Sequence, residues 1–174
     1  MAGHSHWSSV KHKKGVIDQK RGQLFSKLLK AITIAARQEP NPQFNFQLRT
    51  AIEKAKENNV PQDNIERAIK RASEAGENLE ELIIEAYGPE GIAILIEAAT
   101  DNKNRTIAEV KKILNEQNAK WADPGSVQWA FENKDGEWRA KFKQEVSGET
   151  KQKIQILIQA LEKRDDVQKV HTNL

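Results

Sequence analysis

Apolar residues recur with a helical period in three stretches of the first half of the chain. In the first stretch an i, i+3, i+4, i+7 spacing is formed by Phe25, Leu28, Leu29 and Ile32. This pattern starts after Asp18 and ends at the Pro-Asn-Pro of residues 40–42, and the same spacing returns over 48–55 and 65–72. Each repeat places one apolar stripe on a helix. The sequence therefore predicts an N-terminal bundle of three amphipathic helices with short connections.

Beyond Gly76 the helical period gives way to short apolar runs that are rich in β-branched residues. Two such runs, at residues 82–87 and 92–99, flank the segment Gly88-Pro89-Glu90-Gly91. Proline and glycine stand there at positions i+1 and i+3 of a tight turn. The pattern predicts a β-hairpin.

The remaining chain alternates between the two periods. Thr106 and Glu109 have the spacing of a capping box and open a helical stripe that ends at Leu114. Later segments predict two strands, a helix and a final strand, at residues 127–132, 137–146, 154–161 and 167–172. The order β-β-α-β-β-α-β contains the unit of ferredoxin-like folds, so we expect one antiparallel sheet with both helices on one face. The fold class is α+β, with domains at residues 1–76 and 77–174.

Charge divides the chain in the same way. Residues 1–71 hold 14 Lys/Arg against 6 Asp/Glu, whereas residues 72–174 hold 14 against 19, so a net charge of +3 conceals parts of +8 and −5. A basic part of this size indicates a polyanionic partner for the N-terminal domain, although a solvated basic helical face would produce the same count.

Composition excludes several classes of protein. The chain has 37% hydrophobic residues, no cysteine, and no apolar run approaching the roughly 20 residues of a membrane span. Disulfides and thiolate metal sites are therefore absent, and we expect a cytoplasmic protein that makes no membrane contact and is a monomer.

The N-terminal segment carries most of the candidate binding residues. Residues 1–17 are small, polar and basic without a period, which predicts a flexible arm. Trp7 lies in this arm, where it could stack on an unpaired base or anchor the arm on the bundle. The candidate phosphate contacts of the arm and first helix are Lys11, His12, Lys13, Lys14, Lys20, Arg21, Lys27 and Lys30.

Two further clusters extend the candidate surface. Arg67, Lys70 and Arg71 share one face of the third helix, opposite its apolar stripe, as contacts or as an ordinary solvated face. Asn102, Asn104 and Arg105 precede a helix N-terminus, a position that suits a phosphate. Asn and Asp are equally common there as turn and cap residues, which is the structural alternative.

Motifs for catalysis or metal binding are missing from the sequence. His4, His6 and His12 lack a carboxylate or thiolate at a defined spacing, so we expect no metal and interpret them as donors in the arm. No nucleophile with its base, P-loop or dinucleotide glycine motif is present. We expect a protein that is not an enzyme and needs no cofactor.

Several segments are similar to the YebC family of bacterial and organellar gene-expression regulators. They are AGHSHWSSVKHKK at 2–14, RGQLFSKL at 21–28, VPQDNIERAIKRA at 60–72, YGPEGIAILIEAATDNKNRT at 87–106, GSVQWAF at 125–131, and DDVQKV at 165–170 with Asn173. The resemblance implies a nucleic-acid partner. Relatives are described as DNA-binding transcriptional regulators, the mitochondrial one as a translational activator, and bacterial ones increasingly as ribosome-bound, so the type of nucleic acid stays open.

The chain also departs from the family pattern at two places. Relatives usually carry a third domain where only residues 133–136 stand here, which predicts that a module is missing. His6 replaces a common lysine and exchanges a permanent charge for a titratable one.

Three functions fit these observations. An RNA-binding translation factor on the ribosome explains a basic head with an acidic remainder, and we rank it first. A DNA-binding transcriptional regulator shares the electrostatics but shows no helix pair with a recognisable recognition helix. A small-molecule-sensing regulatory domain fits the βαββαβ order and leaves the basic arm unexplained.

Overall fold

The computed structural model describes residues 5–74 and 78–174, and for residues 5–12 it describes the backbone alone. Contacts divide the chain after Lys70 into an N-terminal unit and a C-terminal unit. The predicted boundary between residues 76 and 77 falls outside the described residues. Within those residues the structure has five α-helices and antiparallel strand pairs, which is the predicted α+β class.

The N-terminal unit contains three helices around a small core. They are α1 (Ser5–Ala36), α2 (Phe46–Glu57) and α3 (Gln62–Arg71). Ile32, Leu48 and Ile65 contribute one fully buried aliphatic side chain from each helix. Thr33 on α1 donates its hydroxyl hydrogen to the carbonyl oxygen of Ala68 on α3 at 3.1 Å. The apolar stripes read from the sequence thus face one another.

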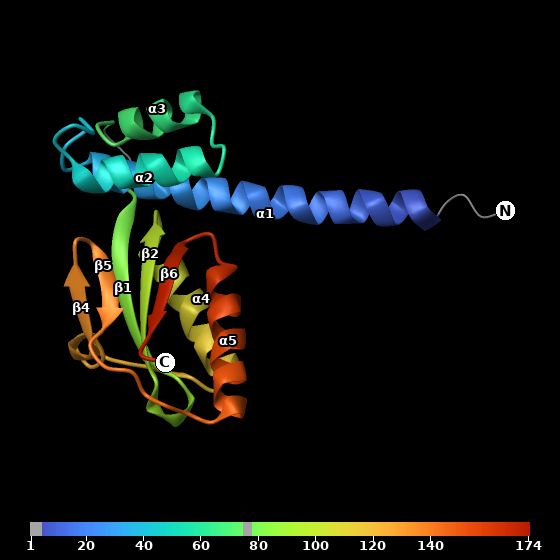
Figure 1. Cartoon of the computed structure of the whole chain (residues 1–174), viewed down its shortest axis with the longest axis vertical. Coiled ribbons are helices and arrows are strands. Elements are labelled where there is room, and N and C mark those ends of the chain that lie inside the picture. The colour runs from blue at the N-terminus through green and yellow to red at the C-terminus, as the bar shows by residue number, and fades with distance from the viewer. Residues whose placement is uncertain (1–4, 75–77) are drawn as a thin grey trace. The chain divides into compact units, whose positions relative to one another are not determined.

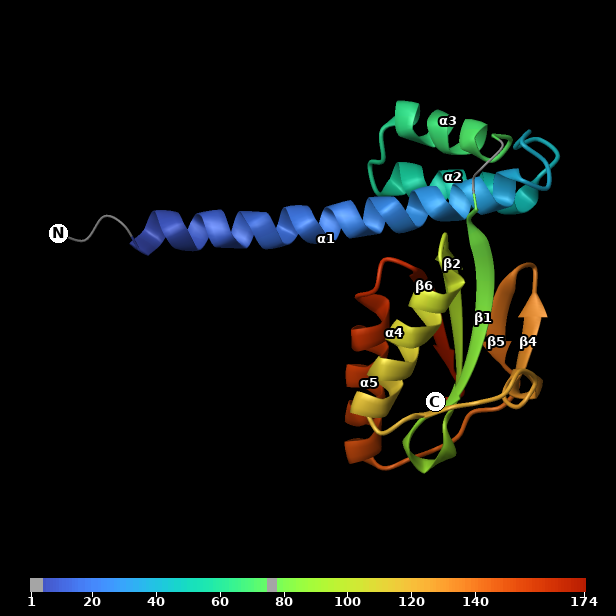
Figure 2. The ribbon, with the colours of Figure 1, turned by 180° about the vertical axis from the view of Figure 1, so that it is seen from behind.

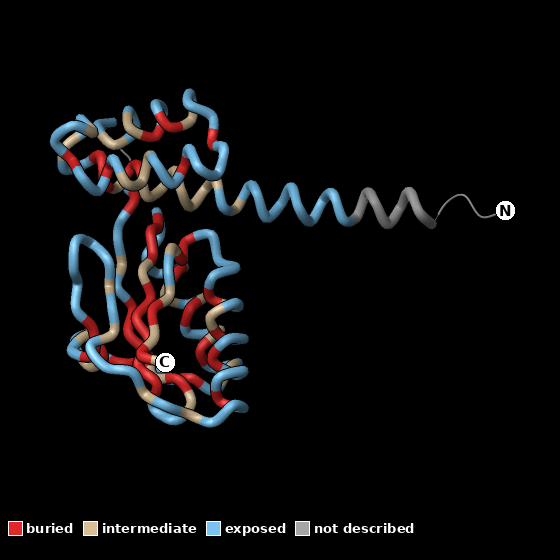
Figure 3. Tube along the Cα trace, viewed as in Figure 1, coloured by how far each residue is buried: buried red, intermediate tan, exposed pale blue. Residues whose placement is uncertain are grey.

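Helix α1 begins earlier than the sequence predicted. The prediction of a flexible arm is wrong for residues 5–17, which continue α1, while residues 1–4 lie outside the described part. The C-terminal half of α1 packs on the other helices, so the helix is already formed where residues 5–17 join it. Each further residue then adds one hydrogen bond, and no proline interrupts the segment. Residues 13–22 are exposed throughout, as the blue tube of α1 shows (Figure 3).

The C-terminal unit is built on a four-stranded antiparallel sheet with the order β3-β1-β2-β6. Its elements, including two short 3₁₀ segments, are β1 (Glu80–Tyr87), η1 (Pro89–Gly91), β2 (Ala93–Thr100), α4 (Lys103–Glu116), β3 (Lys120–Trp121), η2 (Gln128–Ala130), β4 (Phe131–Lys134), β5 (Glu137–Ala140), α5 (Gly148–Glu162) and β6 (Val167–Thr172). Strand β2 pairs with β1 along its whole length and with β6 on its other edge.

Both faces of this sheet are covered. Ile94 and Ile96 of β2 join a core with Leu114 of α4 and Leu157 of α5, so both helices lie on one face. Leu95 points to the opposite face, where it belongs to a smaller cluster. That cluster is supplied by the β4–β5 hairpin and the loop before it, as two opposite views show (Figures 1 and 2). Strand β2 is consequently buried on both sides.

The predicted strand order is wrong in one respect. Strands β4 and β5 pair with each other in a separate two-stranded sheet and do not join the larger one. The predicted strand at 127–132 begins instead with η2, and the predicted strand at 137–146 ends at Ala140. Phe131 and Trp138 turn their apolar surface onto the sheet face, so the hairpin serves as a cover. The two-residue strand β3 was not predicted.

The turn between β1 and β2 is held against α5. A Cβ atom at Gly88 would lie 2.6 Å from Cδ1 of Ile154 and 3.0 Å from Cδ1 of Ile94, so any larger residue would force these buried side chains to shift. Glu90 and Gly91 adopt left-handed backbone angles, with φ of 58° and 76°. The Glu90 carboxylate accepts a hydrogen bond of 2.5 Å from the Thr150 hydroxyl in the first turn of α5.

Candidate nucleic-acid interface

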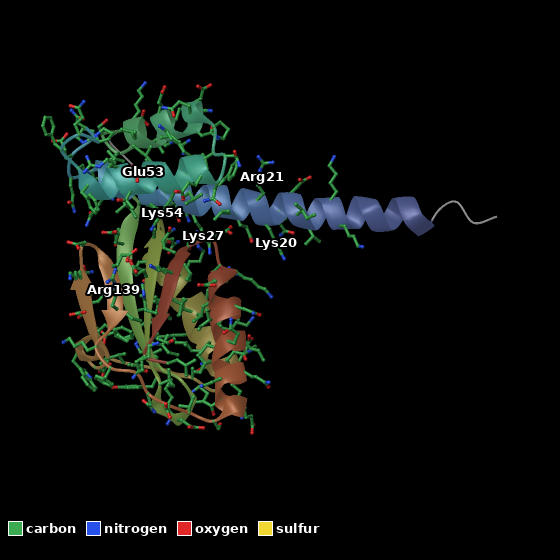
Figure 4. All side chains as sticks on the ribbon, in the orientation of Figure 1. Lys20, Arg21, Lys27, Glu53, Lys54 and Arg139 are labelled. Carbon is green, nitrogen blue, oxygen red and sulfur yellow. The ribbon has the colours of Figure 1, made fainter. Side chains whose placement is uncertain are left out.

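A row of lysines follows one side of α1. Lys13, Lys20 and Lys27 stand seven residues apart, which stacks them two turns above one another at intervals of about 10 Å. We call these three residues the basic row. Lys13 and Lys20 are exposed and Lys27 is half-buried. Figure 4 shows Lys20 and Lys27 on the same side of the helix and Arg21 on the other.

Other predicted cations of α1 surround the basic row. Lys14 and Arg21 are exposed and also seven residues apart, and Lys30 is half-buried. The guanidinium carbon of Arg21 lies 5.2 Å from the centre of the Phe25 ring, one turn further along. The side chains of Trp7, Lys11 and His12 fall outside the described residues, although their backbone belongs to α1.

The predicted cluster on α3 is partly paired within its own helix. Arg67 donates from Nη2 to the side-chain oxygen of Asn64 at 2.6 Å and from Nε to the Asp63 carbonyl at 3.1 Å. Lys70 and Arg71 are exposed on the same helix. Asp63 and Glu66 line a surface hollow together with Arg67 and Lys70, so this face is of mixed charge.

The predicted loop before α4 makes hydrogen bonds and ion pairs within the C-terminal unit. Arg105 donates from Nη2 to Asp166 at 2.9 Å and to Asp101 at 2.8 Å. The hydrogen bond to Asp166, followed by that to Asp101, raises the pKa of Arg105 above its ordinary value. Asp166 is buried and also accepts the Thr106 hydroxyl at 2.7 Å. The guanidinium thus joins the start of α4 to the loop before β6.

The two asparagines of this loop have different positions. Asn102 is the N-cap of α4, because its side-chain oxygen accepts the Arg105 backbone N–H at 3.1 Å. Thr106, the predicted cap, is instead buried among hydroxyl and carboxylate groups. Asn104 is exposed in the first turn of the helix. The cap and ion-pair contacts occupy Nη2 and the backbone N–H of Arg105, two of the donors that a phosphate would use.

A cluster that sequence reasoning missed lies between α1 and α2. Phe44 is 78% exposed and Phe46 is 59% exposed, which is unusual for phenyl side chains. The guanidinium carbon of Arg49 lies 5.6 Å from the centre of the Phe46 ring. The sequence signal is the pair of phenylalanines flanking Asn45, outside the apolar stripe of α2.

Concave and metal-binding features are modest. A shallow groove between α2 and α3 has an aliphatic floor that includes Ile52 and Ile65, with Arg49, Glu53 and Lys56 on its rim. Among the described residues there is no group of His and carboxylate side chains that could hold a metal ion. None of the described helices combines the length and apolar composition that a bilayer crossing requires.

Two models of known protein families match this chain. The family model described as the TACO1/YebC protein N-terminal domain matches residues 5–75. The model described as the TACO1/YebC second and third domain matches residues 79–136. The chain belongs to the TACO1/YebC family. This confirms the resemblance inferred from the sequence segments.

Curated relatives in the TACO1/YebC family are longer than this chain. A protein of Natranaerobius thermophilus is 52% identical over 137 residues and one of Chloroflexus aurantiacus is 54% identical over 140 residues. Both are named "Probable transcriptional regulatory protein". Each match covers 77% of this chain and 55% of the relative, so the matched part spans about half of the relative. The missing module near residues 133–136 stays a prediction.

A solved TACO1/YebC-like structure has the same fold. The conserved hypothetical protein Aq1575 of Aquifex aeolicus superposes with a TM-score of 0.82 at 34% sequence identity. The superposition covers 97% of this chain and 96% of the other. It therefore includes the residues after 136, which the second family model does not reach.

Proposed function

We propose that this protein is a nucleic-acid-binding regulator of gene expression that binds RNA through α1, with the ribosome as its site of action. The observation that carries the proposal is that two lysines of the basic row, Lys13 and Lys20, lie on a helix segment outside the core. Residues 13–22 are exposed throughout, so their side chains are available to a partner.

Electrostatics explains why such a segment would bind RNA. Each lysine that neutralises a phosphate releases condensed counterions, which gives affinity without much sequence discrimination. Residues 1–71 carry a charge of +8, from 14 Lys/Arg and 6 Asp/Glu. The acidic remainder would be repelled by the same polyanion, so the charge division orients the protein on it.

A DNA-binding transcriptional regulator is the second candidate. The names of the two curated relatives favour it directly. The basic row would attract duplex DNA and RNA alike, because both are phosphate polymers. RNA ranks first because the described helices offer exposed lysines for the backbone and no evident set of base-reading side chains on one recognition helix.

The proposal includes three further statements. The protein acts by binding and carries out no catalytic step, works in the cytoplasm without a cofactor, and is a monomer. It uses α1 for phosphate contacts, while the loop before α4 is assigned to stability because Arg105 is bound to Asp101 and Asp166.

Co-sedimentation with ribosomes across a salt series tests the proposal. The variant carries Lys13→Glu and Lys20→Glu, two exposed positions of the basic row. The matched control carries Lys141→Glu and Lys143→Glu, which make the same change in net charge at exposed positions of the C-terminal unit. We expect the native protein and the control to travel with ribosomes at moderate salt and the α1 variant to remain in the supernatant.

Competition separates the two kinds of nucleic acid. An excess of duplex DNA leaves the native protein on ribosomes if RNA is the partner, and removes it if DNA is. Equal release of the α1 variant and the control would refute the assigned role of α1. Failure of the native protein to bind at any salt concentration would refute the ribosomal reading.

A further inference from the structure

Phe44 and Phe46 are mostly exposed, although the chain has few large apolar side chains. The sequence has only 5 phenylalanines, and these two are 78% and 59% exposed. Burying a phenyl side chain stabilises a fold, and these two positions give up most of that gain. Two exposed phenyl groups within three residues of the chain are therefore a candidate contact surface.

Hydrogen bonds of Asn45 hold the backbone that carries the two phenyl rings. We call residues 41–46 the aromatic loop. Asn45, which stands between the two phenylalanines in sequence, is buried and donates from Nδ2 to the carbonyls of Ala35 at 2.7 Å and Glu39 at 2.8 Å. Its side-chain oxygen accepts the Leu48 backbone N–H at 2.9 Å and so caps α2. A fourth hydrogen bond, from the Phe44 N–H to the Asn41 carbonyl at 3.1 Å, closes the turn.

Arg49 adds a positive charge to the same place. Its guanidinium carbon lies 5.6 Å from the centre of the Phe46 ring, within the range of a cation–π contact. Nη1 donates to the carbonyl of Pro42 at 3.2 Å, which ties the guanidinium to the aromatic loop. The result is one exposed ring beside a hydrogen-bonded cation, with a second exposed ring two residues earlier on the same turn.

We propose that the aromatic loop is a stacking platform for unpaired nucleotides, with Phe44 and Phe46 receiving bases and Arg49 facing the phosphate between them. The inference rests on the proposed function and specifies its substrate as single-stranded or unpaired RNA. Flat rings stack on any base, so the platform gives affinity without sequence preference. Because the loop is already ordered, little conformational entropy is lost on binding.

Charge selects a nucleic acid over an apolar protein surface as the occupant. The rings belong to the part of the chain that carries +8, from 14 Lys/Arg and 6 Asp/Glu over residues 1–71. Phenylalanine and arginine are enriched in protein interfaces as well, but those interfaces are depleted of lysine, whereas single-strand sites place aromatic rings in a basic surface. The contact of the Arg49 guanidinium with the Phe46 ring combines a basic side chain and an exposed aromatic ring in this way.

The test is an anisotropy titration of the full chain with a labelled RNA of about 12 nucleotides, a length within the usual range for such surfaces. The same RNA annealed to its complement is the second probe. The variant carries Phe44→Leu and Phe46→Leu, which keep apolar bulk and remove the π face. Phe142→Leu, at an exposed phenylalanine of the C-terminal unit, is the matched control. Thermal unfolding of each variant checks the fold.

We expect the double variant to bind the single strand about tenfold or more weakly and the duplex as well as the native protein does. The slope of log affinity against log salt should stay unchanged, because stacking releases no counterions. Replacing Lys13 and Lys20 by alanine should instead reduce that slope. Phe142→Leu should bind both probes normally.

Three results would overturn the platform. Native binding of the single strand by the double variant refutes stacking and leaves the proposed function standing. An equal loss for strand and duplex assigns the rings to structure. A loss of ribosome co-sedimentation with full single-strand affinity makes the loop a protein contact. If the native protein binds neither probe at any salt concentration, the RNA function itself fails, which the ribosome experiment detects independently.

Discussion

The carboxylate of Glu85 in β1 accepts a hydrogen bond of 2.6 Å from the backbone N–H of Val127, 42 residues further along the chain. It also accepts the N–H groups of Gly125 at 2.6 Å and Gln128 at 2.9 Å. Glu85 is 4% exposed, so three donors of the loop before β4 share one nearly buried acceptor. This contact fixes the segment that covers the second face of the sheet.

Removing that acceptor should destabilise the C-terminal unit. Glu85→Ala leaves the buried Val127 N–H unpaired, together with the partly buried N–H groups of Gly125 and Gln128, and an unpaired buried donor costs about 1–3 kcal/mol. We expect the free energy of unfolding in urea to fall by about 3 kcal/mol. Glu85→Gln should fall less, because one amide oxygen still accepts. Glu132→Ala, at an exposed position of β4, is the control, and an equal effect of both alanine variants would contradict the assignment.

Variants of Arg105 and Asp166 distinguish a structural role of Arg105 from a role in RNA binding. Asp166→Asn weakens the acceptor of the Thr106 hydroxyl and Arg105, and we expect a loss of about 2 kcal/mol in unfolding free energy. Arg105→Ala should lower the melting temperature and leave RNA affinity unchanged. Weaker RNA binding at an unchanged melting temperature would instead support the phosphate site predicted from sequence.

Glycine limits the stability of the exposed part of α1. A Cβ atom at Gly15 or Gly22 would meet nothing within 4 Å, so alanine fits both positions. Each Gly→Ala exchange in a helix interior gains about 0.5–1 kcal/mol. We expect slower amide hydrogen exchange over residues 13–22 and a larger helical circular-dichroism signal for Gly15→Ala with Gly22→Ala. Unchanged exchange would mean that the segment is already fully helical in solution.

Acid should weaken the start of α5. The hydrogen bond from Lys153, at 2.7 Å, and then its charge lower the pKa of Glu149 below the ordinary value of 4.5. A carboxylate with a lowered pKa in the folded state stabilises the fold above its unfolded pKa and loses that contribution as the pH falls through its folded pKa. Native protein should therefore lose more stability below pH 4.5 than Glu149→Gln does, by a small margin because the pair is exposed. Parallel thermal-melting curves of the two proteins across this range would contradict the prediction.

Periodicity predicted the elements that have a single buried stripe. The stripes containing Ile32, Ile65 and Leu114 each mark an observed helix, because burial of one face leaves a repeat in the sequence. It failed where stability comes from elsewhere. The first turns of α1 have no stripe, and the hairpin of Phe131 and Trp138 follows a contact with the sheet that local sequence does not reveal.

The candidate site was predictable to a similar extent. Lysines at a spacing of seven, such as Lys13 and Lys20, can be placed on one side of a helix from sequence alone. The exposure of Phe44 and Phe46 cannot be predicted in this way, because the sequence does not distinguish an exposed phenylalanine from a buried one. The partners of Arg105 could not be found either, because Asp166 lies 61 residues away in sequence. Only a folded chain shows which cations are already bound.

Strand β2 couples the two layers of the C-terminal unit. Ile94 and Ile96 face the helices and Leu95 faces the hairpin, so one strand belongs to both apolar clusters. Neither layer can detach without exposing a side of β2, which makes the two clusters a single cooperative folding unit. The backbone amides of residues 94–96 should accordingly be among the last to exchange, opening only when the whole unit unfolds.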